Sequence, residues 1–580
     1  MKTLLTGFTS FLILVLSFIF SSHREDIGHE RSDAMTALDY WAAQRAYPDR
    51  TIPDDKYYAA YEYAKTHLQS PVDESATDTW QQIGPHNIGG RTLAVAFNPL
   101  NPNTVYACAA SGGLWRSYTG GVGRMAWQQV PTGFPVLGVS SIAIAPNDSN
   151  TIFIGTGEVY AYQNSIGGLS VRTTRGSYGI GILKTTNGGL TWQKVLDWSY
   201  NQKRGVQAIR LNPLNHNTLW AATSEGTYKS INSGASWTLV HSVIMATDIA
   251  ICADDTNVVF VACGNLGSAG NGIYRTTDGG GTFTKLTAGL PASFGGKTLL
   301  AISQSFQNLI YASIGNGSGT GSGTWLVRST NRGDAWTTLS TSDYSTYQGW
   351  YSHFVVVHPT DTSKVVTGGI DMWKSTNGGR TLLIKSDWSA WYFGTPPPGG
   401  PEGPSNYSHA DHHAYAIHPT NPNTVYLATD GGIFRTTDFG ETFAGCNGGY
   451  QSTQFYNGFS CSPIDTVMAM GGLQDNATAI RDSGVAWRRV IGGDGCWTAI
   501  HPANPDTLYG TSQNLNLLKS NNRGNSFFGI GVPGGSSGTS FAAPFVLSRS
   551  NPRTMYAGRD RVYRSTVGGG SWTATTGSAL

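Results

Sequence analysis

The sequence is dominated by one short segment that recurs along the chain, so a repeated structural unit is required. Its clearest copy, FRTTDFGETF at Phe434, has an apolar residue, a basic residue, Ser or Thr, and a turn closed by Gly. The basic residues of ten copies are Arg116, Lys184, Lys229, Arg275, Arg328, Lys374, Arg435, Arg481, Lys519 and Arg564. Five of the nine intervals are 45 or 46 residues, the length of a four-stranded propeller blade.

Each unit is predicted to consist of short β-strands. Residues 407–443 hold three short alternating runs, each closed by Pro, Asn or Gly, before the recurring turn. The sequence therefore predicts an all-β fold, a multi-bladed β-propeller of about ten four-stranded blades over residues 80–580. Two arrangements fit this count: a single ring, which we prefer because two seven-bladed rings need about fourteen units, or two tandem propellers.

The N-terminal region differs from the repeats. Residues 1–22 have one Lys, an apolar run and then small residues, the layout of a cleavable secretory signal. Residues 23–79 are rich in charge and carry apolar residues at helical spacing, which predicts a short helical leader that packs on the propeller. We therefore expect a secreted, extracellular protein with no membrane span in the mature chain.

Charge and cysteine content narrow the classes of partner. The formal net charge is +2 and no basic run stands out, which argues against nucleic acid. The six cysteines include no CxxC, so a cysteine metal site is not expected, although Cys252 could pair with Cys263 and Cys446 with Cys461. No cofactor is expected, and the sequence leaves the oligomeric state open.

The candidate site follows from the order of strands in a blade. In a meander that runs outward from the axis, the turn between the second and third strands and the link between blades open on the same face. The recurring turns, between the third and fourth strands, open on the opposite face and are expected to be scaffold. Ionisable residues gather on the first face: Asp371, Asp430 and Asp475 in turns, and His353, His409, Asp411, His413 and Asp494 in links.

We expect these side chains to meet at one mouth of the propeller, the usual place for its ligand. Asp430, Asp475, Asp494 and Asp371 are candidate catalytic acids, and His353, His409, Asp411, His413, Gln474, Trp391 and Tyr392 are candidate ligand-binding residues. The last two belong to residues 388–407, an insertion rich in Pro, Gly and aromatics that is expected to form a loop over the mouth. His409, Asp411 and His413 alternate along the chain and could ligate a metal, but hydrogen-bonded His–Asp pairing is preferred and no metal is predicted.

The recurring turns resemble the Asp-box, or bacterial neuraminidase repeat. Together with GPHNIGGR at Gly84, SHADHHA at Ser408, GLQDNAT at Gly472 and GGDG at Gly492, they are similar to a superfamily that includes the sortilin propeller and xyloglucanase-type glycoside hydrolases. ATDGGIFR around Asp430 is similar to the context of a catalytic Asp in the xyloglucanase type. In the first unit, however, Ser111 stands where that family's other acid would lie.

Two functional hypotheses remain open at this point. The first is a secreted propeller whose mouth binds a glycan or an extracellular protein. The second is a glycoside hydrolase, which needs a protonated acid and an ionised carboxylate about 5–5.5 Å apart for retention or about 6.5–9.5 Å apart for inversion.

Overall fold

The computed structural model describes residues 33–49, 51, 53–68, 81–136, 138–162, 164–166, 169–316, 323–535 and 538–576. The predicted signal segment, residues 1–22, lies outside them. The prediction of about ten four-stranded β-units is confirmed, because the strands form ten four-stranded antiparallel sheets, here numbered sheets 1 to 10 in chain order, and one two-stranded hairpin.

The first seven sheets contain the following strands. Sheet 1 has β1 (Thr92–Asn98), β2 (Asn101–Ala109), β3 (Gly113–Ser117) and β4 (Trp127–Val130); sheet 2 has β5 (Val139–Ala145), β6 (Asp148–Thr156), β9 (Gly181–Thr185) and β10 (Gln193–Asp197). Sheet 3 has β11 (Val206–Leu211), β12 (Leu219–Thr223), β13 (Gly226–Ser230) and β14 (Thr238–His241); sheet 4 has β15 (Ala246–Ile251), β16 (Val259–Cys263), β17 (Gly272–Thr276) and β18 (Thr284–Lys285). Sheet 5 has β19 (Thr298–Ile302), β20 (Ile310–Gly315), β21 (Thr324–Ser329) and β22 (Thr337–Ser340); sheet 6 has β23 (Phe354–Val357), β24 (Val365–Gly368), β25 (Met372–Ser375) and β26 (Leu383–Ile384). Sheet 7 has β27 (Ala414–Ile417), β28 (Val425–Thr429), β29 (Gly432–Thr436) and β30 (Ala444–Gly445).

The last three sheets and the remaining elements complete the described chain. Sheet 8 has β31 (Phe455–Cys461), β32 (Ala469–Leu473), β33 (Thr478–Arg481) and β34 (Arg488–Ile491); sheet 9 has β35 (Thr498–Ile500), β36 (Leu508–Ser512), β37 (Asn516–Ser520) and β38 (Phe528–Gly529). Sheet 10 has β39 (Phe545–Leu547), β40 (Met555–Gly558), β41 (Val562–Ser565) and β42 (Thr573–Ala574). The hairpin is β7 (Asn164–Ile166) with β8 (Leu169–Val171), the α-helices are α2 (Asp33–Ala46) and α3 (Asp54–His67), and the short 3-10 helices are η1 (Thr346–Gln348) and η2 (Gln513–Leu515).

Sheets 1 to 7 close into a ring. The first strand of each sheet is innermost and packs on the first strand of the next, and β27 and β28 pack on β1. Two long-range hydrogen bonds join sheets 7 and 1: Tyr426 donates to the carbonyl of Gly120 at 2.7 Å, and Trp127 donates to the carbonyl of Cys446 at 2.6 Å. The preferred arrangement of all ten units in one ring is therefore wrong, because sheet 7 already finds its neighbour in sheet 1.

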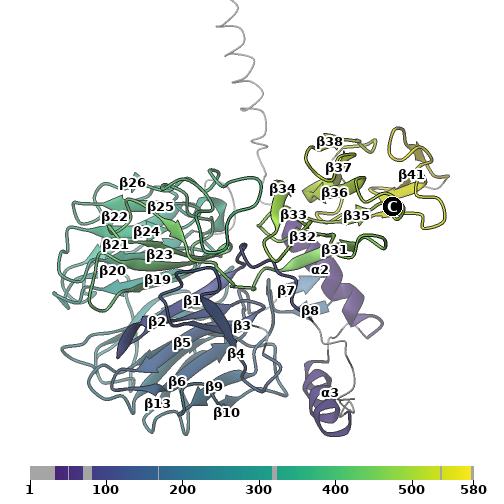
Figure 1. Ribbon diagram of the computed structural model, residues 1–580. Helices are drawn as coiled ribbons and strands as arrows, with labels where there is room; N and C mark the ends of the chain where they lie inside the picture. The colour runs from purple at the N-terminus through teal and green to yellow at the C-terminus, as the bar shows by residue number, and fades with distance from the viewer. Residues whose placement is uncertain are drawn as a thin grey trace, which may run out of the picture.

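Sheets 8 to 10 form a separate group beside the ring (Figure 1). β31 packs on β35, and Tyr509, Phe545 and Met555 fill the core between sheets 9 and 10. On the other side, Ile83 and Ile88 pack on sheet 8 around Trp487, whose indole donates to the carbonyl of Ile83 at 2.7 Å. Because this segment precedes β1, it ties the start of the ring to the three-sheet group.

The structure shows why each unit carries a basic residue. Lys184, Lys229 and Arg275 each reach across to a backbone carbonyl in the recurring turn of the following sheet, at 2.8, 2.6 and 2.6 Å. The Asp or Asn of the turn is also structural: Asp438 accepts hydrogen bonds from two backbone amides, of Glu441 and Thr442. These turns are thus the contacts that fasten neighbouring sheets at their outer rim.

The helices lie in the predicted leader and pack on the sheets. Tyr58 of α3 is 2% exposed in a core with residues of sheets 1 and 2, and Ala46 of α2 is buried against Val171 of the β7–β8 hairpin. Figure 1 shows α2 between that hairpin and β31. Within the described residues, neither helix has the length and apolar content needed to cross a bilayer.

The suggested disulfides are not formed, since all six cysteines are free thiols. The ladder of β15 and β16 explains the first pair: Cys263 lies opposite Ala246, whereas Cys252 follows the far end of β15. In the second pair, Cys461 is exposed at the end of β31, while Cys446 is buried in the core between sheets 7 and 1.

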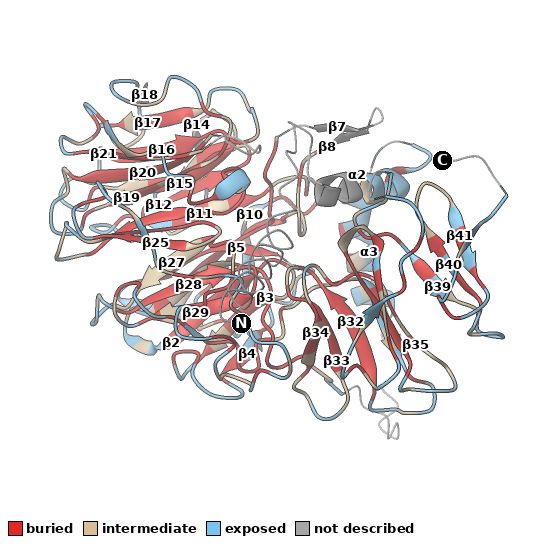
Figure 2. Ribbon diagram, turned by 90° about the horizontal axis from the view of Figure 1, so that it is seen from above, coloured by how far each residue is buried: buried red, intermediate tan, exposed pale blue. Residues whose placement is uncertain are grey.

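One face of sheet 10 has no covering sheet. In several units the second residue of the second strand is aromatic, and it is a tyrosine in sheets 7, 9 and 10 among others. Tyr426 is 3% exposed and Tyr509 is 1% exposed, whereas Tyr556 of sheet 10 is 37% exposed. Figure 2 shows the same contrast between the buried strands of the ring and the exposed segments of sheet 10. The same sequence position therefore contributes differently to stability in different sheets.

We predict that Tyr426→Ala lowers the free energy of unfolding by about 3–5 kcal/mol, as for other large aromatic truncations in a core, because it opens the closure of the ring. The matched change Tyr556→Ala should cost under about 1 kcal/mol. Guanidinium unfolding followed by tryptophan fluorescence measures both. Equal losses of unfolding free energy in the two variants would contradict the closure of the ring between sheets 7 and 1.

Candidate functional site

A long insertion in sheet 2 covers the axial end of the ring. Residues 157–180 separate β6 from β9, whereas only residues 430–431 separate β28 from β29 in sheet 7. The insertion includes the β7–β8 hairpin and carries Glu158, Tyr160 and Arg175. Because it replaces a turn between second and third strands, it lies on the face where the sequence places the candidate site.

Asp430 is the buried centre of the site. Its side chain is fully buried, and its two oxygens accept hydrogen bonds from Nε2 of His413 at 2.7 Å and from the hydroxyl of Tyr351 at 2.6 Å. Arg175 lies 3.9 Å from the same carboxylate and stacks over the Tyr351 ring at 4.3 Å. Burial alone would raise the pKa of Asp430, but His413, Arg91 and Arg175 hold it below the usual range, so Asp430 is ionised.

A second buried ion pair supports the first. Arg91, one residue before β1, lies 3.1 Å from Glu158, and the hydroxyl of Tyr160 donates to Glu158 at 2.7 Å. Arg91 also donates to the backbone carbonyl of Arg175 at 2.7 Å. Since charges buried this deeply are costly unless paired, the network fixes the insertion of sheet 2 against the ends of sheets 1 and 7.

Three further carboxyls surround this centre. Ligand oxygens of Asp411, Asp430 and Asp475 lie within 4.8 Å of one another. The backbone amide of Asp475 donates to Asp494 at 2.8 Å, and Ser352 donates to Asp411 at 2.9 Å. Burial, followed by the charge of Asp430, raises the pKa of Asp411 to about 7. Burial, followed by the charges of Asp494 and Asp430, raises the pKa of Asp475 well above its usual range.

The backbone conformation orients the side chains of Asp411 and Asp475. Asp411 and Asp475 have φ of 63° and 58°, in the left-handed region that Asp adopts more readily than most residues. His409, 8% exposed, contacts the carbonyl of Asp475 at 2.9 Å through Nε2, and Asn476 donates to the carbonyl of Asp430 at 3.0 Å. These contacts join the link before β27 to the turn between β32 and β33, so sheet 8 contributes directly to the site of the ring.

Two tyrosines border the carboxyls. Tyr347, in η1, is 45% exposed, and its pKa is raised by burial of its hydroxyl and then by the charge of Asp411, with a further contribution from Asp475. Tyr456 lies near Asp494 and Asp475, whose charges add to burial in raising its pKa, and its ring is 6.3 Å from that of Trp41 in α2. The accessible part of the site is therefore a carboxyl surface beside aromatic rings.

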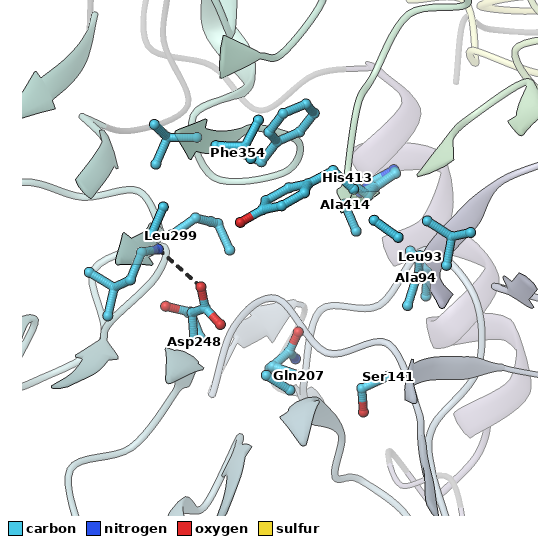
Figure 3. Close-up of a pocket in the computed structure, with 18 of the residues that line it drawn as sticks. Leu93, Ala94, Ser141, Gln207, Asp248, Leu299, Phe354, His413 and Ala414 are labelled. Atoms are coloured by element: carbon cyan, nitrogen blue, oxygen red, sulfur yellow. Dashed lines mark hydrogen bonds between the residues drawn. The ribbon is translucent and has the colours of Figure 1, made fainter. Parts of the chain in front are cut away.

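A channel lies along the axis of the ring, next to this site. It has a volume of about 430 Å³ and is lined by residues of the innermost strands together with Glu158, Lys297 and His413. In Figure 3, Ser141, Gln207, Asp248, Phe354 and His413 surround the same space. His413 thus borders the channel and also contacts Asp430 of the mouth.

The structure brings together five residues singled out from the sequence: His409, Asp411, Asp430, Asp475 and Asp494. His413 joins them through Asp430, and Gln474 is buried next to Asp475, with its backbone amide donating to the carbonyl of Gln454 at 2.9 Å.

The remaining candidates lie in other surroundings. Asp371 accepts hydrogen bonds from Ser386 and from the backbone of Trp388 in its own sheet. His353 is fully buried, with its ring nitrogens against Ser313 at 2.7 Å and the carbonyl of Gly349 at 3.1 Å. The contacts of Asp371 and of His353 are therefore those of local packing.

The insertion 388–407 packs at the joint between the ring and sheet 8. Gly394 forms a bridge with Arg489 of β34, and Glu402 pairs with Arg489 at 2.7 Å. The rings of Trp391 and Phe393 are tilted against each other with their centroids 4.2 Å apart, and Tyr392 is 46% exposed. These contacts link the loop to β34 and leave Trp388, Tyr392 and Phe393 as its exposed aromatics.

Sequence reasoning missed Arg175 and Tyr347 altogether. A signal for Arg175 was present in the spacing of the repeats, because the first interval, from Arg116 to Lys184, is 68 residues instead of 45 or 46. That excess is the insertion of sheet 2. Nothing in the sequence around Tyr347 distinguishes it from the other tyrosines.

The carboxyl cluster also has the composition of a cation site. Asp411, Asp430 and Asp475 are suitable hard ligands, but Arg175 lies 3.9 Å from Asp430 and 3.6 Å from Asp475. A guanidinium therefore already supplies positive charge to two of the three acids.

Comparisons with known proteins indicate the fold. No protein-family model and no curated protein matches this sequence. An ancestral GH74 enzyme of known structure is 16% identical, with a TM-score of 0.58, over 85% of this chain and 69% of that chain. The GH74 enzyme from Niastella koreensis is 18% identical with a TM-score of 0.37, over 86% of this chain and 87% of that chain. The GH74 xyloglucanase from Xanthomonas campestris is 15% identical with a TM-score of 0.37, over 86% and 95%. At these identities, the first likeness shows the β-propeller fold alone.

We predict that Asp411 makes stability depend on pH near neutrality. Its folded pKa, about 7, lies above the ordinary value of 3.8, so the folded state keeps a proton that the unfolded state has released between these values. The free energy of unfolding should therefore fall as pH rises through this interval, by about 1.4 kcal/mol per unit from this group.

Asp411→Asn should lack this pH-dependent contribution to the free energy of unfolding. It should therefore be more stable than the wild type above pH 7. Guanidinium midpoints at pH 5, 6, 7 and 8 measure the difference, with the exposed Asp506→Asn as the control. Parallel pH profiles for the wild type and Asp411→Asn would contradict the raised pKa.

Proposed function

We propose that this chain is a secreted propeller protein that binds a glycan at the mouth formed by the carboxyl cluster, the insertion of sheet 2 and sheet 8. The observation that carries the proposal is the combination of accessible acids and an exposed aromatic: Asp475 keeps 19% of its side-chain surface exposed, and Tyr347 is 45% exposed beside it. Carboxyls bond sugar hydroxyls, and an aromatic ring packs on the apolar face of a sugar.

The buried half of the site favours binding because it holds the acids in place before a ligand arrives. Asp430 is fixed by His413 and Tyr351, and Arg175 lies between Asp430 and Asp475. A rigid polar surface loses less conformational entropy when a ligand binds. Burial of Asp430 also leaves it with no free oxygen for chemistry.

A glycoside hydrolase is the second candidate, and one observation favours it. Asp475, with its raised pKa, would hold a proton near the ionised Asp430, the combination that acid catalysis needs. The hypothesis also agrees with the sequence resemblance to the xyloglucanase type and with the GH74 fold likeness. The oxygens of Asp411, Asp430 and Asp475 lie within 4.8 Å of one another, nearer to the spacing of about 5–5.5 Å in retaining enzymes than to that of about 6.5–9.5 Å in inverting ones. Against the hydrolase, both oxygens of Asp430 already accept hydrogen bonds, from His413 and Tyr351.

A glycan screen followed by calorimetry tests the binding proposal. Tyr347→Ala should weaken binding by about fivefold to tenfold, the loss of one aromatic contact of about 1 kcal/mol. Tyr392→Ala is the matched control because Tyr392 is equally exposed, at 46%, but lies on the 388–407 insertion. If only Tyr392→Ala weakens binding, the ligand site lies on that insertion instead of at the mouth.

The same glycans separate binding from hydrolysis. We expect the wild type to bind without releasing reducing ends. Asp475→Asn keeps the shape of the side chain but cannot donate a proton. Turnover by the wild type that disappears in Asp475→Asn, with binding retained, would establish the hydrolase instead.

We also infer export from residues 1–22, whose apolar run resembles a cleavable signal. Expression of the full chain with its own N-terminus should give a product in the medium or periplasm that begins near residue 23. Intact-mass measurement decides this, and a retained Met1 in the membrane fraction would contradict it.

A further inference from the structure

The residue just before the innermost strand occupies the same axial position in every sheet of the ring. In sheets 1 to 7 these residues are Arg91, Gly138, Gly205, Met245, Lys297, His353 and His413. Four of the seven are basic side chains, and the other three have small or apolar side chains. Of these four basic residues, Lys297 and His413 line the channel.

Three of the four basic groups have partners of their own. Arg91 pairs with Glu158, His413 with Asp430, and His353 contacts Ser313. Lys297 differs: among the described residues, no carboxylate oxygen lies within the 4.0 Å of its amine that an ion pair requires. Its side chain is one of those that line the channel.

The acids nearest to Lys297 are already neutralised. Asp248 accepts from Arg210 at 2.7 Å and from the backbone amide of Leu300 at 3.0 Å. Glu158 is held by Arg91 and Tyr160. Asp430, whose charge also reaches Lys297, is bonded to His413 and Tyr351. All three acids therefore have other partners, and within the described residues Lys297 has no close carboxylate.

The surroundings of Lys297 also affect its pKa. Burial lowers the pKa of Lys297 to about 8, although Asp248, Glu158 and Asp430 oppose the shift. A half-buried ammonium without a close carboxylate among the described residues is costly, and an anion within reach would offset that cost. The channel, at about 430 Å³, falls in the range of small-molecule sites, so it has space for such a group.

We propose that Lys297 binds the anionic group of an acidic sugar, a carboxylate or a sulfate ester, in the channel. This inference rests on the proposed glycan-binding function and specifies its ligand class as an acidic polysaccharide. The anion lies beside the ammonium in the channel, which His413 also lines. The protonated lysine donates hydrogen bonds to the anion, and no covalent step is involved.

Calorimetry with three matched oligosaccharides tests the proposal: one ending in glucuronate, one with a sulfate ester, and one neutral. At pH 7 the wild type should bind at least one acidic form about tenfold or more tightly than the neutral form, as expected for hydrogen bonds to a buried charge. Lys297→Met should remove that preference and leave affinity for the neutral form unchanged. Lys285→Met, on the exposed outer strand β18, is the control and should change nothing.

The pH dependence identifies the lysine as the binding group. Affinity for the acidic ligand should decline above pH about 8, as the ammonium of the free protein loses its proton. Lys297→Arg should retain the preference without this decline, because a guanidinium stays charged. A decline of the same size in Lys297→Arg would overturn the assignment.

The outcomes separate this inference from the function on which it rests. Equal affinity for neutral and acidic glycans, unaffected by Lys297→Met, overturns the inference and leaves glycan binding intact. Monomeric glucuronate is the direct probe of the channel. If it binds the wild type but not Lys297→Met, and no oligosaccharide binds, the anion site is supported and the proposed glycan function is contradicted. If neither glucuronate nor any acidic glycan binds, the inference is overturned.

Discussion

The contact between sheets 7 and 1 is the constraint on which the rest of the structure depends. Tyr426 of β28 packs into the core of sheet 1 and bonds to Gly120, and Trp127 bonds to Cys446. Until these contacts form, the sheets are an open row, in which each contacts only its neighbours. Closure brings the start of the first sheet beside the start of the seventh and creates both the axial channel and the mouth.

The site exists because several loops end at the same point of the closed ring. Arg91 comes from the start of sheet 1, Arg175 from the insertion of sheet 2, and Asp430 from the turn of sheet 7. Each buried charge has a partner from a different sheet, so the network depends on the closure of the ring. A buried network of this kind stabilises one arrangement of the loops, since removing one partner leaves the other uncompensated.

The three-sheet group adds what the ring alone lacks. Asp475 and Asp494 come from sheet 8, and the first is joined to His409 of the ring through its backbone carbonyl. These two acids are the more accessible members of the cluster, whereas Asp430 is buried beneath them. The ring therefore supplies the rigid floor and the channel, and sheet 8 supplies the polar edge that a ligand meets first.

Much of this could be predicted from local sequence, because a β-propeller is built from repeats whose signals lie within about 45 residues. The recurring turn gave the strand content, and strand order placed Asp411, Asp430 and Asp475 on one face, because each turn belongs to a known position in its unit. The roles of those acids remain predictions, as does the sequence resemblance to the Asp-box superfamily.

The sequence by itself determined the all-β repeat, the number of units and the face on which the acids gather, since these follow from period, turn chemistry and strand order. Only the tertiary structure decided where the ring closes, because seven and ten units have the same local pattern and differ only in the angle between neighbouring sheets. It also decided which groups are partnered. Arg175 reaches Asp430 from an insertion far away in the chain, and within the described residues Lys297 has no ion-pair partner because Arg210 and Arg91 bind Asp248 and Glu158.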